Sequence, residues 1–231
     1  MNFEALLDGE LWEAIVLTCR LAITTTAVLL LIGMPLAYWL NASRWRGTVL
    51  VEALVSLPIV LPPTVIGFYL LMLMAPQSGF GRYWLDIFGY TLTFSFTGLV
   101  IGSVLYSLPF AVQPFQVALG SVPVELIESG TALGAGRWAL FWKVMLPVAR
   151  PGILIGCMLS FAHTLGEFGV VLMLGGSLPG KTRVASIALF DKVQQLDYPA
   201  AHAYALVLLC IAFGLLVSIA LLRAHSQKQG A

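Results

Sequence analysis

The stretch that decides the fold is Glu128-Ser-Gly-Thr-Ala-Leu-Gly134, followed after nine residues by Val144-Met-Leu-Pro147. It is a charged, turn-rich island between two long apolar runs. The segment Val124 to Leu133 is expected to form a short helix that carries Glu125 and Glu128. On composition alone, the island is an interfacial loop between two membrane spans.

The second half of the island is suited to a turn and to a membrane surface. Gly134 and Gly136 are expected to free the backbone to turn. Arg137-Trp-Ala-Leu-Phe-Trp-Lys143 is a basic-aromatic segment, and indole rings favour the headgroup level of a bilayer. Pro147 and Pro151 open the next apolar run, where the first helical turn tolerates proline.

The composition places the chain in a membrane. Of its 231 residues, 59% are hydrophobic and only 10% are charged, with a mean hydropathy of +0.94. A soluble domain carries about 25% charged residues. The net charge of +1 argues against a nucleic-acid role, and three cysteines without paired spacing predict neither a disulfide nor a metal site. We therefore expect an all-α integral membrane protein.

Five apolar segments are long enough to cross a hydrocarbon core of ~30 Å, at about 20 residues per span. The predicted spans are 14–40, 49–74, 98–119, 151–174 and 203–222, with the island in the loop 120–147. The segment from Pro76 to Ser95 is expected to be a polar-aromatic loop, and 175–201 a longer polar segment.

The distribution of cations favours one orientation. Cytoplasmic loops of membrane proteins carry an excess of Lys and Arg. With the island in the cytosol, seven such residues lie inside and four lie clearly outside. The inner group is Arg44, Arg46, Arg137, Lys143, Arg150, Arg223 and Lys228, and the outer group is Arg82, Lys181, Arg183 and Lys192. The acidic N-terminus is then external.

The second span should be broken near its centre. Leu57-Pro-Ile-Val-Leu-Pro-Pro-Thr64 contains Pro58, Pro62 and Pro63, and each proline removes an intrahelical hydrogen bond. In lipid, such breaks persist only where protein or a water-filled cavity receives the freed carbonyls. The segment up to Thr64 is therefore either a packing kink or part of a pathway.

The fourth span carries Glu167, the one acid placed deep in an apolar run. A carboxylate there costs about 2.5–3.5 kcal/mol on insertion scales, so it should be protonated, paired or facing a cavity. His163, four residues earlier on the same predicted helix face, is its candidate partner. Gly166 and Gly169 are expected to loosen the helix around the acid, which either holds a bend near a gate as a structural group or belongs to the translocation pathway. An ionised carboxylate would repel an anionic substrate, which favours the structural role.

Gly175-Gly-Ser-Leu-Pro-Gly-Lys181-Thr182 fits the phosphate-loop pattern of nucleotide-binding proteins. That motif needs a strand before the loop and a helix after it, so that backbone N–H groups surround the phosphates. Here an apolar span precedes the loop, and the predicted orientation places it outside. We expect a Gly/Pro turn before an external helix, and a phosphate-loop ATPase is one alternative.

The island resembles the cytoplasmic loop of ABC importer permeases, whose short coupling helix sits in a cleft of the ATPase subunit. Ser129 and Gly130 replace the usual alanine pair, and Val144 replaces the usual isoleucine. The residues to which the resemblance gives a coupling role are Glu125, Glu128, Ser129, Gly130, Gly134, Gly136, Arg137, Val144, Leu146 and Pro147. A cytoplasmic coupling helix is therefore implied between spans three and four.

Four further stretches resemble the permease subunits of bacterial molybdate ABC transporters. They are Leu57 to Gly67, Leu133 to Trp138, Leu165 to Gly169, and Pro179 to Arg183. The resemblance covers nearly the whole chain and implies a bacterial inner-membrane permease for molybdate, with tungstate and sulfate as alternatives. Lys181 stands where the family usually has an acid, which adds positive charge outside.

The resemblance also implies partners. Residues 1–231 would form one permease domain, paired with a second permease copy, two copies of an ATPase subunit and a periplasmic oxyanion-binding protein. ATP and magnesium would be held by the ATPase, so this chain is expected to carry no catalytic residue, metal or cofactor. The alternative of another class is a stand-alone channel or secondary transporter, in which only His163 and Glu167 could couple ions.

Overall fold

The computed structural model describes residues 9–229, with side chains described up to Leu221. Residues 1–8 of the acidic N-terminus and the side chains of Arg223 and Lys228 lie outside this part. All its regular elements are helices, as predicted. They are α1 Gly9–Ala42, α2 Thr48–Val60, α3 Pro63–Met74, α4 Gly79–Phe88, α5 Phe96–Gly120, α6 Val124–Ala132, α7 Arg137–Leu140, a π-helical turn Phe141–Met145, α8 Leu146–Leu165, α9 Gly169–Gly175, α10 Ala185–Gln194 and α11 Tyr198–Gln229.

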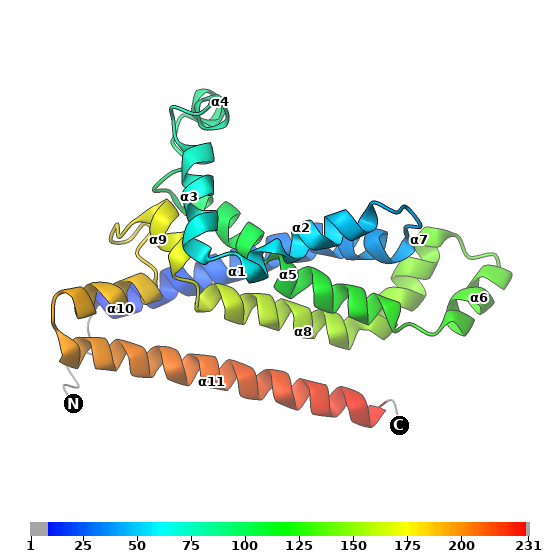
Figure 1. Cartoon of the computed structure of the whole chain (residues 1–231). Coiled ribbons are helices and arrows are strands. Elements are labelled where there is room, and N and C mark those ends of the chain that lie inside the picture. The colour runs from blue at the N-terminus through cyan, green and yellow to red at the C-terminus, as the bar shows by residue number, and fades with distance from the viewer. Residues whose placement is uncertain (1–8, 230–231) are drawn as a thin grey trace.

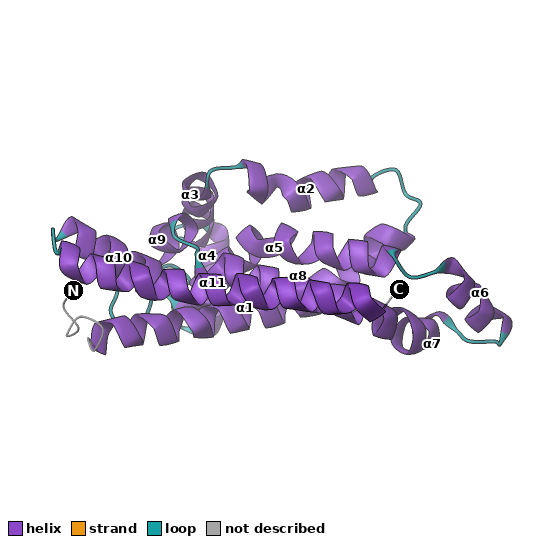
Figure 2. Cartoon of the chain, turned by 90° about the horizontal axis from the view of Figure 1, so that it is seen from below, coloured by secondary structure: helices purple, strands orange, loops and turns teal. Residues whose placement is uncertain are grey.

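The long helices run side by side along one axis (Figures 1 and 2). Among the described residues, four helices are long and apolar enough to cross a membrane, and α2 with α3 forms a fifth, bent candidate. Helix α1 begins and α11 ends at opposite ends of the bundle in Figure 1, as an odd number of crossings requires. The α6 end and the α10 end are thus the two membrane faces.

Helices α1, α5 and α8 form the centre of the bundle, and small residues let them approach closely. A Cβ on Gly152 would lie 2.5 Å from Cβ of Ala118, and one on Gly156 would lie 2.7 Å from the Phe115 ring. In lipid, where apolar burial between helices gains little, such close packing supplies the attraction. Helix α11 lies along the outside of this core, next to α8 (Figure 1).

The predicted break in span two is confirmed. Helix α2 ends at Val60, Pro62 precedes α3 and Pro63 begins it, and the two helices meet at a bend of 111°. Proline at the first helical position costs no hydrogen bond, so the second proline starts a new helix in a new direction. Helix α3 therefore leaves the bundle as an arm that α4 extends (Figure 1).

The loop predicted from Pro76 to Ser95 is wrong in part, because α4 lies within it. The Ser78 hydroxyl accepts a hydrogen bond from the Gly81 N–H at 2.9 Å, and Gly89 ends the helix at φ +72°. A side-chain cap at the start and a left-handed glycine at the end are the usual signals of a short helix.

The predicted limits of span four also need correction. A continuous helical run from Arg137 to Leu165 replaces the predicted start at Pro151, and it passes through the π-helical turn. Pro147 lies in the first turn of α8 as expected, but Pro151 lies inside the helix. Neither proline has the N–H group that would donate a hydrogen bond to a carbonyl of the preceding helical turn. The π-helical turn lies where these intrahelical hydrogen bonds are missing.

Candidate functional site: an exposed helical loop and two meeting helix breaks

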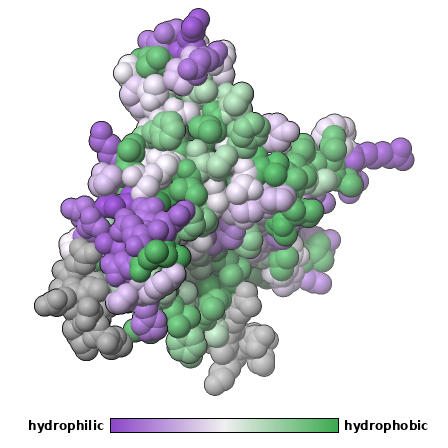
Figure 3. Space-filling model, turned by 60° about the vertical axis from the view of Figure 1, so that its left-hand side comes forward, coloured by the Kyte–Doolittle hydropathy of each residue, from purple (hydrophilic) through white to green (hydrophobic). Residues whose placement is uncertain are grey.

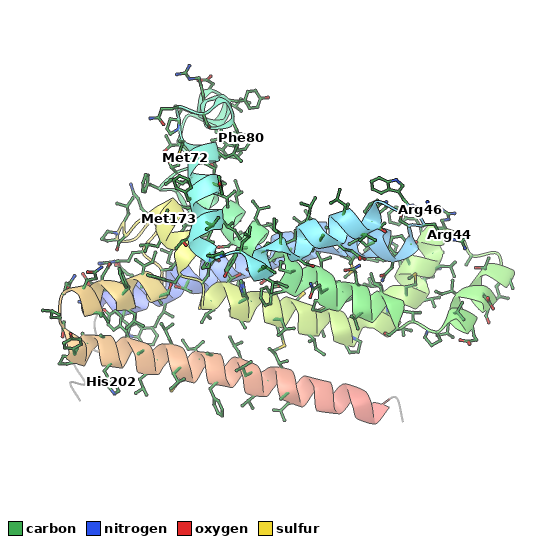
Figure 4. The ribbon with its side chains drawn as sticks, viewed as in Figure 1. Arg44, Arg46, Met72, Phe80, Met173 and His202 are labelled. Carbon is green, nitrogen blue, oxygen red and sulfur yellow. The ribbon has the colours of Figure 1, made fainter. Side chains whose placement is uncertain are left out.

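The predicted short helix is confirmed as α6, which ends at Ala132, one residue before the expected limit. It lies beyond the end of the bundle, on the same side as Arg44 and Arg46 (Figure 4). None of its residues is buried, and both Glu125 and Glu128 are exposed. A helix with this much free surface at a membrane face is available to a partner protein.

One side of α6 is anchored to the bundle. Ile127 packs, with Phe141 and Met145 of the π-helical turn, against the buried cluster that contains Phe115 and Ile153. The sequence analysis did not predict a role for Ile127, although Ile127 and Thr131 lie four residues apart and therefore share one face of the predicted helix. The anchor leaves Glu125 and Glu128 of α6 exposed, and it connects α6 to α8 through the cluster that contains Ile153.

The loop glycines differ in what the geometry requires. Gly134 has φ +83°, in the left-handed region that favours glycine. A Cβ on Gly130 would lie 2.5 Å from Cδ2 of Leu140, which is the end of a flexible side chain that can shift. The Gly134 N–H donates to the Thr131 carbonyl at 2.9 Å and closes the turn. Gly136 has φ −71° and ψ 164°, an extended backbone open to any residue, so its predicted role in the turn is wrong.

The remaining predicted coupling residues lie along the same hairpin. Ser129 is exposed on α6, Arg137 begins α7, Val144 lies in the π-helical turn, and Leu146 and Pro147 begin α8. The structure thus brings all the loop residues chosen from the sequence to one end of the molecule.

The second candidate site joins two interrupted spans. Helix α8 stops at Leu165, and α9 begins at Gly169. A Cβ on Gly169 would lie 2.9 Å from Cβ of Pro63, and one on Gly67 would lie 2.8 Å from Cβ of Met173. Met173 lies beside α3 in Figure 4. The break at Pro62 and Pro63 and the break between Leu165 and Gly169 therefore meet in space, a contact that the sequence did not predict.

The other residues of the predicted pathway lie around this contact. Pro58 lies inside α2 and is partly exposed, whereas Thr64 is exposed in the first turn of α3. Helices interrupted inside a membrane end in free backbone groups, which must be received by protein or by a water-filled path. The arrangement suits a gate in which two half-helices move against each other.

The predicted pair of His163 and Glu167 is wrong. His163 Nδ1 lies 2.9 Å from the Ser107 hydroxyl, and its ring stacks on Phe110 at 3.8 Å between centroids. The Ser107 hydroxyl also lies 3.0 Å from the Thr164 hydroxyl. Because α8 ends at Leu165, Glu167 is no longer on the helical face that His163 occupies.

Glu167 is buried within the chain, with 4% of its surface exposed. Its carbonyl accepts a hydrogen bond from the Ser186 hydroxyl at 2.6 Å, which ties the break to α10. Ser103 on α5 faces the carboxyl, yet within the described residues neither carboxyl oxygen completes a hydrogen bond. The side chain thus points into the fold, where a charge would lack compensation.

The loop that matches the phosphate-loop pattern has another structure. Helix α9, and no strand, precedes it, and the Thr182 hydroxyl donates to the Gly175 carbonyl at 2.6 Å. In a phosphate loop this hydroxyl binds the metal ion of the nucleotide. Here it is 0% exposed and closes the loop internally, so the geometry favours the predicted Gly/Pro turn.

A multi-span helical bundle with two interrupted helices in contact and an anchored helical loop at one face defines a membrane transport component. Comparison with known proteins agrees. Residues 29–229 match the family model described as "binding-protein-dependent transport system inner membrane component", and the chain belongs to this family.

The relatives by sequence include molybdenum and sulfate transport system permeases. The chain is 46% identical to the molybdenum transport system permease protein ModB of Azotobacter vinelandii, over 94% of this chain and 95% of that protein. It is 35% identical to ModB of Escherichia coli (strain K12), over 82% of each chain. It is 37% identical to the sulfate transport system permease protein CysT of the same strain, over 84% of this chain and 69% of that one.

Solved structures share the fold. The MetNI methionine ABC transporter in an inward-facing conformation aligns with a TM-score of 0.73 at 17% identity, over 97% of this chain and 99% of that chain. A bacterial ABC transporter for alginate import aligns with a TM-score of 0.72 at 19% identity, over 99% of this chain and 84% of that chain. The predicted fold of an ABC importer permease is confirmed.

Proposed function

We propose that this chain is the permease subunit of an ABC importer that carries molybdate into the cytoplasm, with ATP hydrolysed by a separate subunit. The observation that carries the proposal is the 46% identity to a molybdenum permease across nearly the full length of both proteins. On this proposal the chain is not an enzyme and holds no nucleotide, metal or other cofactor.

The coupling element is α6. Its exposed face, with Glu125 and Glu128, enters a cleft of the ATPase subunit, and Ile127 passes the movement to the π-helical turn. The rest of the loop shapes this hairpin: Gly130 permits close packing on Leu140, and Gly134 permits the turn. Because α7, the turn and α8 form one helical run, a displacement of α6 rocks the fourth span.

The gate lies where α3 and α9 meet. When the ATPase subunits close on ATP, the spans rock and the contact of Pro63 with Gly169 shifts, so that the path faces the binding protein. Backbone N–H groups at the starts of half-helices and hydroxyls such as that of Thr64 can replace water around a dianion. Glu167 is structural in this scheme, since an ionised carboxylate would repel the substrate.

A second permease copy completes the path. The arm of α3 and α4 presents large exposed apolar side chains, among them Phe68, Tyr69, Met72 and Phe80. Figure 4 labels Met72 and Phe80 on this arm, away from the bundle. Such a projecting apolar surface suits a neighbouring chain as well as lipid. We propose that two identical copies associate, with two ATPase subunits on the α6 face and a periplasmic oxyanion-binding protein on the other.

The test is transport by the assembled complex. The chain is co-expressed with its ATPase and binding-protein partners, reconstituted in proteoliposomes, and assayed for molybdate uptake with and without ATP. We expect uptake that depends on ATP and on the binding protein. Uptake by the chain alone without ATP would favour a channel or secondary transporter and overturn the proposal.

Sulfate and tungstate are the competing substrates, because the chain also resembles a sulfate permease at 37% identity. The same proteoliposomes decide among them by competition at equal concentrations. Molybdate should be displaced by unlabelled molybdate and tungstate more strongly than by sulfate. If sulfate is the strongest competitor, the ABC importer assignment stands and the substrate assignment changes.

A further inference from the structure

A small hollow opens at the α10 end of the bundle, the face opposite α6, with a volume of about 380 Å³. It is formed where α1, the start of α5 and the loop before α10 meet. Two cationic residues and three hydroxyl residues line it: Arg20, Lys181, Tyr90, Thr91 and Ser95. No acidic residue of the described chain lines it. Figure 3, which brings this end forward, shows hydrophilic surface there beside the hydrophobic bundle.

Lys181 is held at the hollow by the loop that matches the phosphate-loop pattern. The Leu178 carbonyl accepts hydrogen bonds from the N–H groups of Lys181, Thr182 and Arg183 at 3.0–3.1 Å. The buried Thr182 hydroxyl also accepts from the Leu178 N–H at 3.3 Å. A loop closed by this many internal bonds projects the Lys181 side chain from a fixed backbone.

Within the described part of the chain, the two cations of the hollow differ from the neighbouring cations in their ion pairs. Arg183 and Lys192 each lie beside Glu10, at 3.5 and 3.4 Å. Arg20 lies over the Phe96 ring at 4.7 Å, and neither it nor Lys181 makes an ion pair with a described residue. Contact with an aromatic face leaves the guanidinium charge in place. The hollow therefore carries two positive charges that no ion pair within residues 9–229 neutralises.

We propose that this hollow binds a tetrahedral oxyanion group at the outer face of the protein. A guanidinium and an ammonium supply charge-assisted hydrogen bonds. The Tyr90 hydroxyl, 3.1 Å from the Thr97 hydroxyl, can add a donor, whereas the hydroxyls of Thr91 and Ser95 already donate to the backbone carbonyls of Thr93 and Leu92. The positive end of the 25-residue helix α5 adds to the attraction, since Ser95 precedes its first residue. The group is either a free anion of the substrate class or the phosphate of an anionic lipid headgroup. The choice of substrate anion rests on the proposed function, but the binding itself does not.

The test measures the reactivity of Lys181 in the purified full-length chain. The chain is placed in nanodiscs of zwitterionic lipid, and an amine-reactive reagent is added with sulfate or molybdate, against chloride at equal ionic strength. Mass spectrometry then follows acylation of Lys181 and of Lys143, which is exposed at the opposite face. At ten times the dissociation constant, binding should slow Lys181 about tenfold, because occupancy leaves about one site in eleven free. The rate at Lys143 should not change.

Two variants assign the effect to the hollow. Arg20→Gln should remove the protection of Lys181, whereas Arg82→Gln, on exposed α4 at the same end, should leave it intact. Protection that survives Arg20→Gln, or that appears equally at Lys143, is ionic screening and overturns the proposal.

A second arm distinguishes the two sources of the group. Nanodiscs that contain anionic phospholipid but no added oxyanion are labelled in the same way. Protection there alone assigns the hollow to a lipid phosphate, and protection by sulfate or molybdate in zwitterionic discs assigns it to the free anion. If Lys181 is protected in neither of the two arms, the proposed site is refuted. No outcome depends on transport, so failure here leaves the proposed function standing, and failure of transport leaves the site standing.

Discussion

Two glycine-bearing stretches, Gly130–Gly136 and Gly166–Gly169, look alike in sequence but differ in what their glycines do. In the first, Gly134 has φ +83° and no atom would lie within 4 Å of an added Cβ, so glycine serves the backbone conformation. In the second, Gly169 has no positive φ, but an added Cβ would lie 2.9 Å from Pro63. The first stretch turns an exposed loop and the second lets two helices touch.

Each stretch also contains a glycine that the structure does not require. Gly136 has an extended backbone with open space around it, and a Cβ on Gly166 would meet only carbonyl oxygens, at 3.8 and 3.9 Å. The chain therefore supplies its own matched controls. A substitution at Gly134 or Gly169 can be compared with a substitution two or three residues away.

The largest expected effect concerns where the two stretches lie relative to the membrane. A single cysteine at Ala135, beside the turn, should not react with an impermeant thiol reagent in intact cells, whereas one at Ser177, after α9, should react. Both positions lie outside the apolar spans, at opposite ends of the bundle. The measurement is labelling before and after permeabilisation, in a background with Cys19, Cys157 and Cys210 replaced. Labelling of Ala135→Cys from outside would show that the chain has the opposite orientation in the membrane, and it would contradict the proposed coupling role of α6.

Gly169→Val should be the most damaging single substitution of the comparison. Its side chain would be forced against Pro63 at the start of α3, and overpacking of a tight contact costs typically 1–3 kcal/mol. We expect a lower yield of folded protein in detergent, a lower melting temperature and loss of uptake.

The control is Gly166→Ala, whose Cβ fits at ordinary contact distance. It should be close to the parent in yield and uptake. Equal damage from both substitutions would mean that the break needs flexible glycines rather than a close contact between α3 and α9.

Gly134→Val should act on function more than on folding. A β-branched residue in the left-handed region costs roughly 1–2 kcal/mol, but the turn lies in an exposed loop, so insertion and yield should stay near normal. We expect the assembled complex to hydrolyse ATP without proportionate uptake, because α6 can no longer hold its position against the π-helical turn.

Gly136→Ala is the matched control and should transport normally, since its backbone suits any residue. The ratio of substrate carried to ATP hydrolysed is the quantity to measure. A normal ratio in Gly134→Val would show that this turn is not needed for coupling.

The sequence predicted features that depend on local chemistry. The five apolar segments, α6, the bend at Pro62 and Pro63, and the turn at Gly134 all follow from composition, proline and glycine, and all are present. Helix α4 was missed because its ten residues mix polar and aromatic side chains within a loop-like composition. Its cap at Ser78 and its terminal Gly89 were signals that could have found it.

What the sequence could not supply was contact between distant segments. His163 was assigned to Glu167 because a helix was assumed to continue through both residues. The helix instead ends between them, and His163 finds Ser107, 56 residues away. Likewise, no pattern in either span predicts that Pro63 would touch Gly169. Such pairings come from how helices pack, and a single sequence carries no direct signal for them.

The smallest effect in the comparison is expected from Glu167→Gln, inside the second stretch. The carboxyl is buried, faces Ser103 and completes no hydrogen bond with the described chain. An amide of the same shape fills the same space without charge, so we expect a folded, assembled complex with nearly normal uptake. Glu167→Ala should be worse, because removing a buried side chain leaves a cavity, at a cost of about 2 kcal/mol or more.

Yield and melting temperature measure the effect of each Glu167 substitution on folding, and uptake by the folded fraction measures its effect on transport. If Glu167→Gln assembles normally yet loses uptake, or changes which oxyanion is carried, the acid belongs to the transport path. In that case the second stretch is part of the path itself rather than a packing joint beside it.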